Sequence, residues 1–139
     1  MSTRSIIAST INGQTTGIYC HFDGYPSGVG ATLAAHYTTP EKIAALIALG
    51  SLSVLAENIA PAEGQAHSFD RKAEGVTVAY HRDRGEELDP GETMAAEAFM
   101  ANPPDFGQDY TYVHDGEKWM IQGRGNWRPL LDVLAESQD

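Results

Sequence analysis

The sequence predicts one α+β domain over residues 1–139, with a mainly antiparallel sheet of about five strands and three to four helices packed on one face. Two turn signals support this prediction, because Asn12-Gly13 and Asp115-Gly116 each interrupt a run of β-branched and aromatic residues. The predicted helices do not alternate with the strands as they would in an α/β fold. A chain of 139 residues is long enough to bury one sizeable core.

The first predicted elements are two strands and a helix. Residues 5–11 and 15–22 form a hairpin around Asn12-Gly13, which favours a type I′ turn. A turn with three glycines, 24–30, then leads into a helix over 29–37, where apolar residues recur at helical spacing. We expect the turn glycines to need backbone angles that alanine tolerates poorly.

The next helix has clear start and stop signals. Thr39 is a good N-cap and Pro40 suits the first helical position, so a helix is predicted over 40–49. Gly50 is a typical residue for the end of such a helix. Residues 51–55 predict a further short helical turn.

The middle of the chain is predicted to alternate between loops and short elements. Residues 60–75 and 87–91 are loops, because they combine proline, glycine and charge without periodicity. Residues 76–80 form a β-branched strand between these loops, and 93–101 form a helix. The sequence Asn102-Pro103-Pro104 ends that helix.

The C-terminal part is expected to contain a second hairpin and a last helix. Residues 110–114 and 118–122 are its two strands, joined through Asp115-Gly116. The final helix is predicted over 129–135.

Composition indicates a globular cytoplasmic protein. Hydrophobic residues make up 42% of the chain and charged residues 20%. There is no apolar run near the length of a membrane span, and the first residues lack the apolar segment of a signal peptide. Cys20 is the only cysteine, which rules out an internal disulfide and fits a reducing compartment. We therefore expect a cytoplasmic location and no membrane partner.

The net charge of −10 is concentrated in the second half of the chain. Between Asp83 and Glu117, ten acidic residues stand against Arg84 alone. Direct nucleic-acid binding is not expected, since it needs a basic surface. The acidic segment has two interpretations, which stay open. It is either a solvated surface that keeps the protein soluble, or a surface that mimics the phosphate backbone and occupies a nucleic-acid-binding partner.

Two polar stretches, 19–30 and 80–86, follow predicted strands and are expected to meet in one site. Arg82 and Arg84 would point the same way on an extended segment, and their guanidinium groups suit phosphate oxygens. Tyrosines beside them could stack on a base. The alternative is that both arginines pair with Asp83, Glu86 or Asp23 and lock a loop. The predicted ligand-binding residues are Arg4, Tyr19, His21, Asp23, Tyr25, His81, Arg82 and Arg84.

No metal or cofactor is expected. Two His-x-Asp pairs, His21 with Asp23 and His81 with Asp83, offer ligands that zinc or manganese accept. No H-E-x-x-H sequence or pair of cysteines accompanies them. The glycines of 24–30 also lack the lysine of a phosphate-binding P-loop.

No catalytic residue is assigned. Cys20 and His21 are adjacent on a predicted strand and point to opposite faces, so they do not form a nucleophile and base. General acid–base chemistry by His21 with Asp23 stays open.

Several of these residues occur together in a known family. The chain resembles a family of small phage and prophage proteins without an assigned activity, and the resemblance covers about the first two thirds of the chain; the last third matches only loosely. It implies a viral accessory gene that is expressed in the bacterial cytoplasm, and it carries over no catalytic residue. The matching residues are Thr3-Arg4-Ser5, Ile18-Tyr19-Cys20-His21-Phe22-Asp23-Gly24-Tyr25-Pro26, Gly28-Val29-Gly30, Leu33, His36-Tyr37, Lys42, Leu46, Leu49-Gly50, Leu52-Ser53, Leu55, His67-Ser68-Phe69 and Tyr80-His81-Arg82-Asp83-Arg84-Gly85-Glu86.

Small viral accessory proteins that lack a catalytic motif are often inhibitors of host defence, and this context guides the functional hypothesis. We expect a non-enzymatic counter-defence protein that binds and sequesters an anionic nucleotide signal of host immunity. Two alternatives stay open: an acidic, nucleic-acid-mimicking inhibitor of a host nuclease or CRISPR complex, and a small hydrolase that uses His21 and Asp23. The expected partners are a small anionic nucleotide or a host defence protein. A structural role in the phage and a homo-oligomeric state also stay open.

Overall fold

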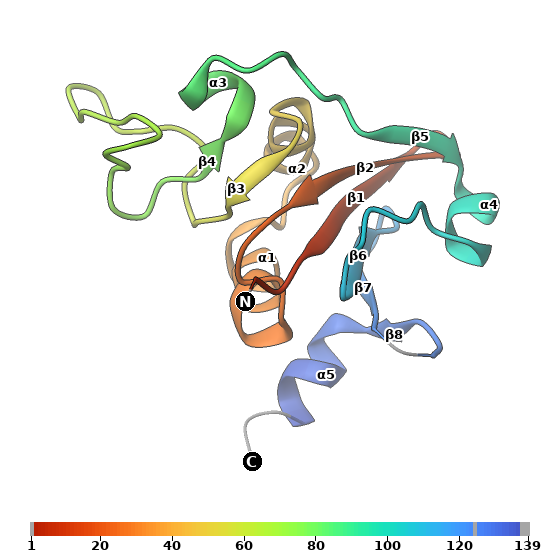
Figure 1. Ribbon diagram of the computed structural model, residues 1–139. Coiled ribbons are helices and arrows are strands. Elements are labelled where there is room, and N and C mark those ends of the chain that lie inside the picture. The colour runs from red at the N-terminus through yellow and green to blue at the C-terminus, as the bar shows by residue number, and fades with distance from the viewer. Residues whose placement is uncertain (1, 124, 137–139) are drawn as a thin grey trace.

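A computed structural model describes residues 2–123 and 125–136 and shows an α+β fold around a mixed sheet (Figure 1). The strands are β1 (Ser5–Ile11), β2 (Gln14–Cys20), β3 (Leu52–Val54), β4 (Val78–Ala79), β5 (Glu92–Ala95), β6 (Tyr110–His114), β7 (Trp119–Gln122) and β8 (Arg128–Pro129). Their order is β4-β3-β2-β1-β6-β7-β8, and β5 pairs with β2 beside β3. The described residues thus form eight strands, more than the predicted five. Several of these strands are only two to four residues long.

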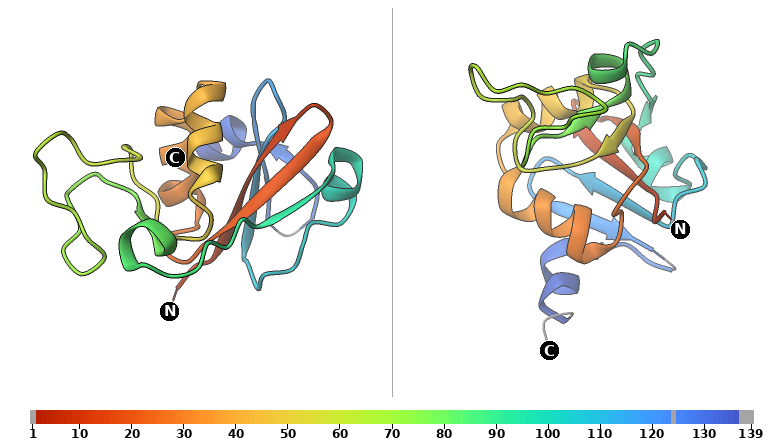
Figure 2. Two further views of the ribbon diagram at one scale, coloured as in Figure 1. Left: turned by 90° about the horizontal axis from the view of Figure 1, so that it is seen from above. Right: turned by 60° about the vertical axis from the view of Figure 1, so that its left-hand side comes forward.

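The helices lie on both faces of this sheet. They are α1 (Ala31–His36), α2 (Pro40–Ala48), α3 (Tyr80–Arg84), α4 (Ala96–Ala101) and α5 (Leu130–Glu136), preceded by a π-helical turn, η1 (Pro26–Gly30). Seen from above, α1, α2 and α5 lie on one side of the β1–β2 hairpin and α4 lies on the other (Figure 2). The prediction that all helices cover one face is therefore wrong. None of the helices in the described ranges has the length and apolar character needed to cross a bilayer.

Both predicted hairpins are confirmed. In the first, Asn12 and Gly13 have φ angles of 53° and 77°, as a type I′ turn requires, and Ile11 faces Gln14. In the second, His114 of β6 faces Trp119 of β7 across the Asp115-Gly116 turn.

Strand β1 is the centre of the sheet. It pairs with β2 in an antiparallel and with β6 in a parallel arrangement, and Ser5 faces Tyr110. Side chains on its two faces enter two separate apolar clusters, with Ile7 in the larger cluster under α1 and α2 and Ile6 in the smaller one against Phe99 of α4. All three side chains are fully buried. Because alternate residues of a strand point to opposite faces, a strand apolar at successive positions must be covered on both.

The start and stop signals of α2 are also confirmed. The Thr39 hydroxyl accepts a hydrogen bond from the Lys42 N–H at 3.3 Å, and Pro40 occupies the first turn. Gly50 follows the helix with a φ of 75°, a left-handed angle that ends helices.

Three local predictions are wrong, and tertiary pairing explains two of them. Residues 52–54 are strand β3 instead of a helical turn, because this segment fills the space between β2 and β4. The helix predicted over 93–101 begins only at Ala96, since Glu92–Ala95 pairs with β2 as β5. The stretch 80–84 is helix α3 and not an extended segment. Intrinsic propensity is a weak guide where a neighbouring strand offers backbone hydrogen bonds.

The turn 24–30 is a rigid connection, for a different reason from the one predicted. Gly24, Gly28 and Gly30 have ordinary negative φ angles, whereas Asp23 adopts a left-handed φ of 59°. The glycines are needed because the backbone passes close to other atoms. A Cβ on Gly24 would lie 2.8 Å from the Thr3 carbonyl oxygen, and one on Gly28 would collide with the Asp23 carbonyl oxygen. The predicted backbone-angle requirement is therefore replaced by a packing requirement.

We expect Gly24→Ala to destabilise the protein by about 1–3 kcal/mol, the usual effect of overpacking against backbone atoms. Gly30→Ala should have a smaller effect, because its Cβ would meet the flexible end of Leu130 at 3.1 Å. Ser27→Ala, in the same turn but exposed, is the matched control. Urea unfolding measures all three, and equal midpoints for Gly24→Ala and Ser27→Ala would contradict the packing explanation.

Candidate functional site

The two polar stretches are brought to one face of the sheet by strands β2, β3 and β4. Cys20 pairs with Leu52, and Leu52 pairs with Ala79, so these three residues form a buried row across the sheet. The side chains next to them, on Tyr19 and Ser51, therefore point to the opposite face. Tyr80 follows β4 and donates its backbone N–H to the Ser51 carbonyl oxygen at 3.2 Å.

This face carries two adjoining hollows that share Ser51 and Asp89, and we call them together the groove. The Ser51 hydroxyl donates to the Asp89 carboxylate at 3.1 Å, which holds the segment after α3 against β3. One hollow is lined by Tyr19, Ser51, Asp89, Gly91, Glu92 and Phe106. The other is lined by Ser51, Tyr80, His81, Arg84, Glu86, Glu87 and Asp89.

At one end of the groove, Tyr19 and His21 form a hydrogen-bonded pair. The Tyr19 hydroxyl lies 2.7 Å from His21 Nδ1, and His21 Nε2 lies 3.4 Å from the Ser2 hydroxyl oxygen. Burial raises the pKa of the Tyr19 phenol, and the charge of Arg4 opposes this rise, so the Arg4 guanidinium lies within electrostatic reach of Tyr19.

The Arg4 guanidinium is free for a ligand. Its backbone is fixed, because the Asp109 N–H donates to the Arg4 carbonyl oxygen at 2.9 Å and the Arg4 N–H donates to the Asp109 carboxylate at 3.2 Å. Its side chain is exposed, passes Gly107 beside Phe106, and has no hydrogen bond or ion pair among residues 2–123 and 125–136. Arg4 does not line either hollow, but its charge acts on the Tyr19 phenol, so an uncompensated guanidinium lies near this end of the groove in the described part of the chain.

Asp23 and Tyr25 lie apart from the groove lining. The Tyr25 hydroxyl donates to the Asp23 carboxylate at 3.2 Å on the exposed turn after β2. The negative charge of Asp23 raises the pKa of the Tyr25 phenol. The described hydrogen bonds of the His21 imidazole go to Tyr19 and Ser2, so His21 and Asp23 are not joined as an acid–base pair.

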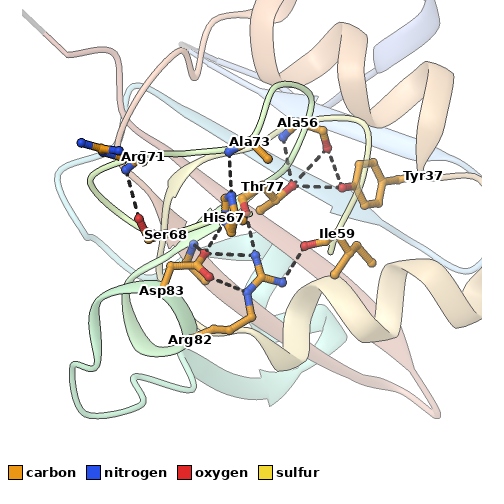
Figure 3. Close-up of polar contacts among 11 residues, drawn as sticks. Tyr37, Ala56, Ile59, His67, Ser68, Arg71, Ala73, Thr77, Arg82 and Asp83 are labelled. Carbon is orange, nitrogen blue, oxygen red and sulfur yellow. Dashed lines mark hydrogen bonds and ion pairs between the residues drawn. The ribbon is translucent and has the colours of Figure 1, made fainter. Parts of the chain in front are cut away.

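The Arg82 guanidinium is hydrogen-bonded to other groups of the same chain (Figure 3). Its Nε and Nη2 donate to the two oxygens of Asp83 at 2.9 and 3.0 Å. Its Nη1 donates to the Ile59 carbonyl at 2.6 Å and Nη2 to the Thr77 carbonyl at 2.7 Å. Four of its five N–H groups are thus used within the chain. The expectation that Arg82 and Arg84 face one ligand rested on an extended segment, and in helix α3 residues two apart point in different directions.

Asp83 is the centre of this buried network. Its side chain is 5% exposed, accepts the Ala79 N–H at 2.8 Å, and lies 3.2 Å from His67 Nε2. His67 Nδ1 accepts the Ala73 N–H at 2.9 Å, which leaves the imidazole proton on Nε2, facing Asp83. Burial raises the pKa of Asp83, but the hydrogen bonds from Arg82, Ala79 and His67 outweigh it and lower the pKa. The network ties the 60–75 loop, which is a loop as predicted, to helix α3.

His81 and Arg84 remain at the second end of the groove. The Arg84 Nε lies 3.1 Å from the Glu86 carboxylate, and its guanidinium lies over the Phe69 ring at 4.8 Å. His81 Nδ1 lies 2.7 Å from the Glu86 carbonyl oxygen. Arg84 is therefore partly compensated, in contrast to Arg4.

Ser51, Asp89, Glu92 and Phe106 are groove residues that the sequence did not indicate. Ser51 directly precedes β3 and Glu92 begins β5, the two strands that were predicted largely as helix, whereas Asp89 and Phe106 lie in loops. The lone Phe106 within an acidic loop was the only local signal. Among the described residues, no group of three or more His, Cys, Asp and Glu side chains could hold a metal ion.

Comparisons with protein families, with curated proteins and with solved structures give no match for this chain.

Asp83→Asn should lower the free energy of unfolding by about 3 kcal/mol at neutral pH, the low end for breaking a buried ion pair, because Arg82 retains some hydration. The side chain of Arg82 is 28% exposed. Asp70→Asn, an exposed carboxylate on the same loop, is the control.

The same variant should also be less sensitive to acid. Because the folded-state pKa of Asp83 is lowered, its stabilisation is complete above the ordinary value of 3.8 and is lost as the pH falls through the folded-state pKa. Urea unfolding at neutral pH and near pH 3 should therefore show a smaller difference for Asp83→Asn than for the unmodified protein. An equal difference would mean that Asp83 is not a source of the acid sensitivity.

Proposed function

We propose that this chain is a non-enzymatic counter-defence protein that binds and sequesters an anionic nucleotide in the groove between Tyr19 and Tyr80. The observation that carries the proposal is the Arg4 guanidinium, which has no described side-chain partner, whose charge acts on the Tyr19 phenol of the groove, and which lies near Gly107, the residue after Phe106. Guanidinium groups bind phosphate oxygens with two parallel hydrogen bonds, and aromatic rings stack on bases.

The mixed charge of the groove suits a nucleotide better than a simple anion. Glu92 and Asp89 line the same hollow as Tyr19, and carboxylates accept hydrogen bonds from ribose hydroxyls or base N–H groups. A nucleotide has a phosphate for Arg4, a flat base for the aromatic side chains and such donors for the carboxylates. An inorganic anion has only the negative charge that Arg4 would bind, and the acidic side chains would repel it.

The biological part of the proposal comes from the resemblance to small phage and prophage proteins. A viral accessory protein in the bacterial cytoplasm would meet the nucleotide signals of host immunity there. This context makes sequestration the proposed role of binding, and a location in the host cytoplasm is part of the same proposal.

An acidic inhibitor that mimics nucleic acid is the second candidate, supported by the net charge of −10. Six of the ten acidic residues in 83–117 are engaged within the chain, either in ion pairs or as acceptors of backbone or hydroxyl hydrogen bonds. The remaining four lie in three places: Glu87 and Glu92 at the groove, Glu97 on α4 and Glu117 in the β6–β7 turn. A phosphate mimic needs its charges in one array, so this candidate has less support.

A hydrolase that uses His21 with Asp23 has the least support. Asp23 is hydrogen-bonded to Tyr25, and His21 to Tyr19 and Ser2.

Arg4→Ala should weaken nucleotide binding by about ten- to a hundredfold, since a hydrogen bond to a charged group contributes about 1.5–3 kcal/mol. Calorimetric titration with a panel of linear and cyclic nucleotides measures the affinity. Arg71→Ala, an exposed arginine on the 60–75 loop whose charge is not among those acting on Tyr19, is the control and should bind as the unmodified chain does. Equal affinities for Arg4→Ala and Arg71→Ala would remove Arg4 from the site.

A double charge reversal, Glu97→Lys with Glu117→Lys, separates the two candidates. Both residues are exposed and lie outside the groove lining, so nucleotide affinity should not change. A phosphate mimic would lose inhibition of its host complex, because the new lysines would repel a basic groove. Loss of inhibition together with intact nucleotide affinity would favour the second candidate.

A further inference from the structure

Three side chains form a hydrogen-bonded row at the end of the groove. The Ser2 hydroxyl oxygen lies 3.4 Å from His21 Nε2, and His21 Nδ1 lies 2.7 Å from the Tyr19 hydroxyl oxygen. The imidazole also packs edge-on against the Phe22 ring, with 4.5 Å between the two ring centroids. Both ring nitrogens of His21 thus have one defined oxygen neighbour each.

The backbone holds this row in place. Tyr19 and His21 are two residues apart on an extended chain and therefore share a face. The His21 N–H donates to the Leu52 carbonyl at 3.0 Å, which fixes the end of β2 against β3. The Gly24 N–H donates to the Thr3 carbonyl at 2.8 Å, which places the residue after Ser2 beside the turn. The sheet therefore holds Tyr19 and His21, and the turn holds the chain next to Ser2.

We infer that Ser2 is a nucleophile, with His21 as its general base and Tyr19 as the residue that positions the imidazole. When His21 carries its proton on Nδ1 and donates it to the Tyr19 oxygen, the lone pair of Nε2 faces the Ser2 hydroxyl. This is the relation between nucleophile, base and orienting group that activates serine in acyl transfer. The substrate class is an activated carboxylic ester.

The step is a single acyl transfer to Ser2. A bond forms between Ser2 Oγ and the ester carbonyl carbon, and the hydroxyl proton moves to His21 Nε2. The bond from the carbonyl carbon to the leaving oxygen then breaks, and that oxygen takes the proton from Nε2. This reactivity goes beyond nucleotide binding and does not depend on it.

The test uses p-nitrophenyl acetate as the probe, with release of p-nitrophenolate and the intact mass as readouts. We expect one acetyl group per chain, mapped to Ser2 by peptide mass spectrometry and removed by hydroxylamine, which cleaves esters and leaves amides. Ser2→Ala should not gain this ester. His21→Gln should react at least about a hundredfold more slowly, the usual contribution of a general base.

Tyr19→Phe tests positioning separately, because it keeps the ring and removes only the hydroxyl. It should slow acetylation, and the imidazole ¹⁵N chemical shifts of His21 should show a changed tautomer balance, which a purely structural role would not produce.

Ser27→Ala is the matched control, since Ser27 is exposed and has no imidazole neighbour among the described residues. It should react as the unmodified chain does, and thermal unfolding of every variant verifies the fold. Acetylation of His21→Gln at the unmodified rate, a hydroxylamine-resistant product, or an ester at a residue other than Ser2 would each overturn the inference.

Discussion

The enclosure of β1 on both edges and both faces is the constraint on which the rest of the structure depends. Its edges are hydrogen-bonded to β2 and β6, and Ile6 and Ile7 enter opposite apolar clusters. Such a strand requires a cover on each side, which α1, α2 and α5 supply on one face and α4 on the other. The Phe99 ring of α4 packs against Gly17 of β2, whereas Phe99 does not line the hollow beside Tyr19, further along that strand. The groove lies where this second cover ends, so the candidate site is a consequence of incomplete coverage of one face.

A buried carboxylate decides how the neighbouring arginines are used. Asp83 needs several donors to remain charged inside the protein, and Arg82 is the closest cation that can supply two. Arg84 lies on another side of the short helix α3 and remains at the surface with Glu86. Two arginines of similar sequence context therefore have separate roles, one in the stability of the 60–75 loop and one at the rim of the groove.

Local signals in the sequence predicted the fold better than they predicted the site. The α+β class, the two hairpins, the cap of α2 and the 60–75 loop follow from turn and cap residues that act over four or five positions. Strands β3 and β5 were missed because pairing with distant segments makes them strands, β2 for both and also β4 for β3. The same omission hid Ser51 and Glu92, which these two strands carry or adjoin. The direction of Arg82 depends on whether residues 80–84 are helical, and its pairing with Asp83 agrees with the alternative that the sequence left open.

The parallel pairing of β1 with β6 joins the beginning of the chain to its last third. During synthesis the β1–β2 hairpin leaves the ribosome long before β6 is made. One edge of β1 and the apolar side chain of Ile6 therefore stay exposed until β6 is available. An open edge of this kind is a template for pairing with other chains, and the exposure lasts as long as translation of the middle segment. A nascent chain that stalls before Tyr110 would therefore be a substrate for holding chaperones and proteases, which links the abundance of this protein to the speed at which its acidic middle segment is translated.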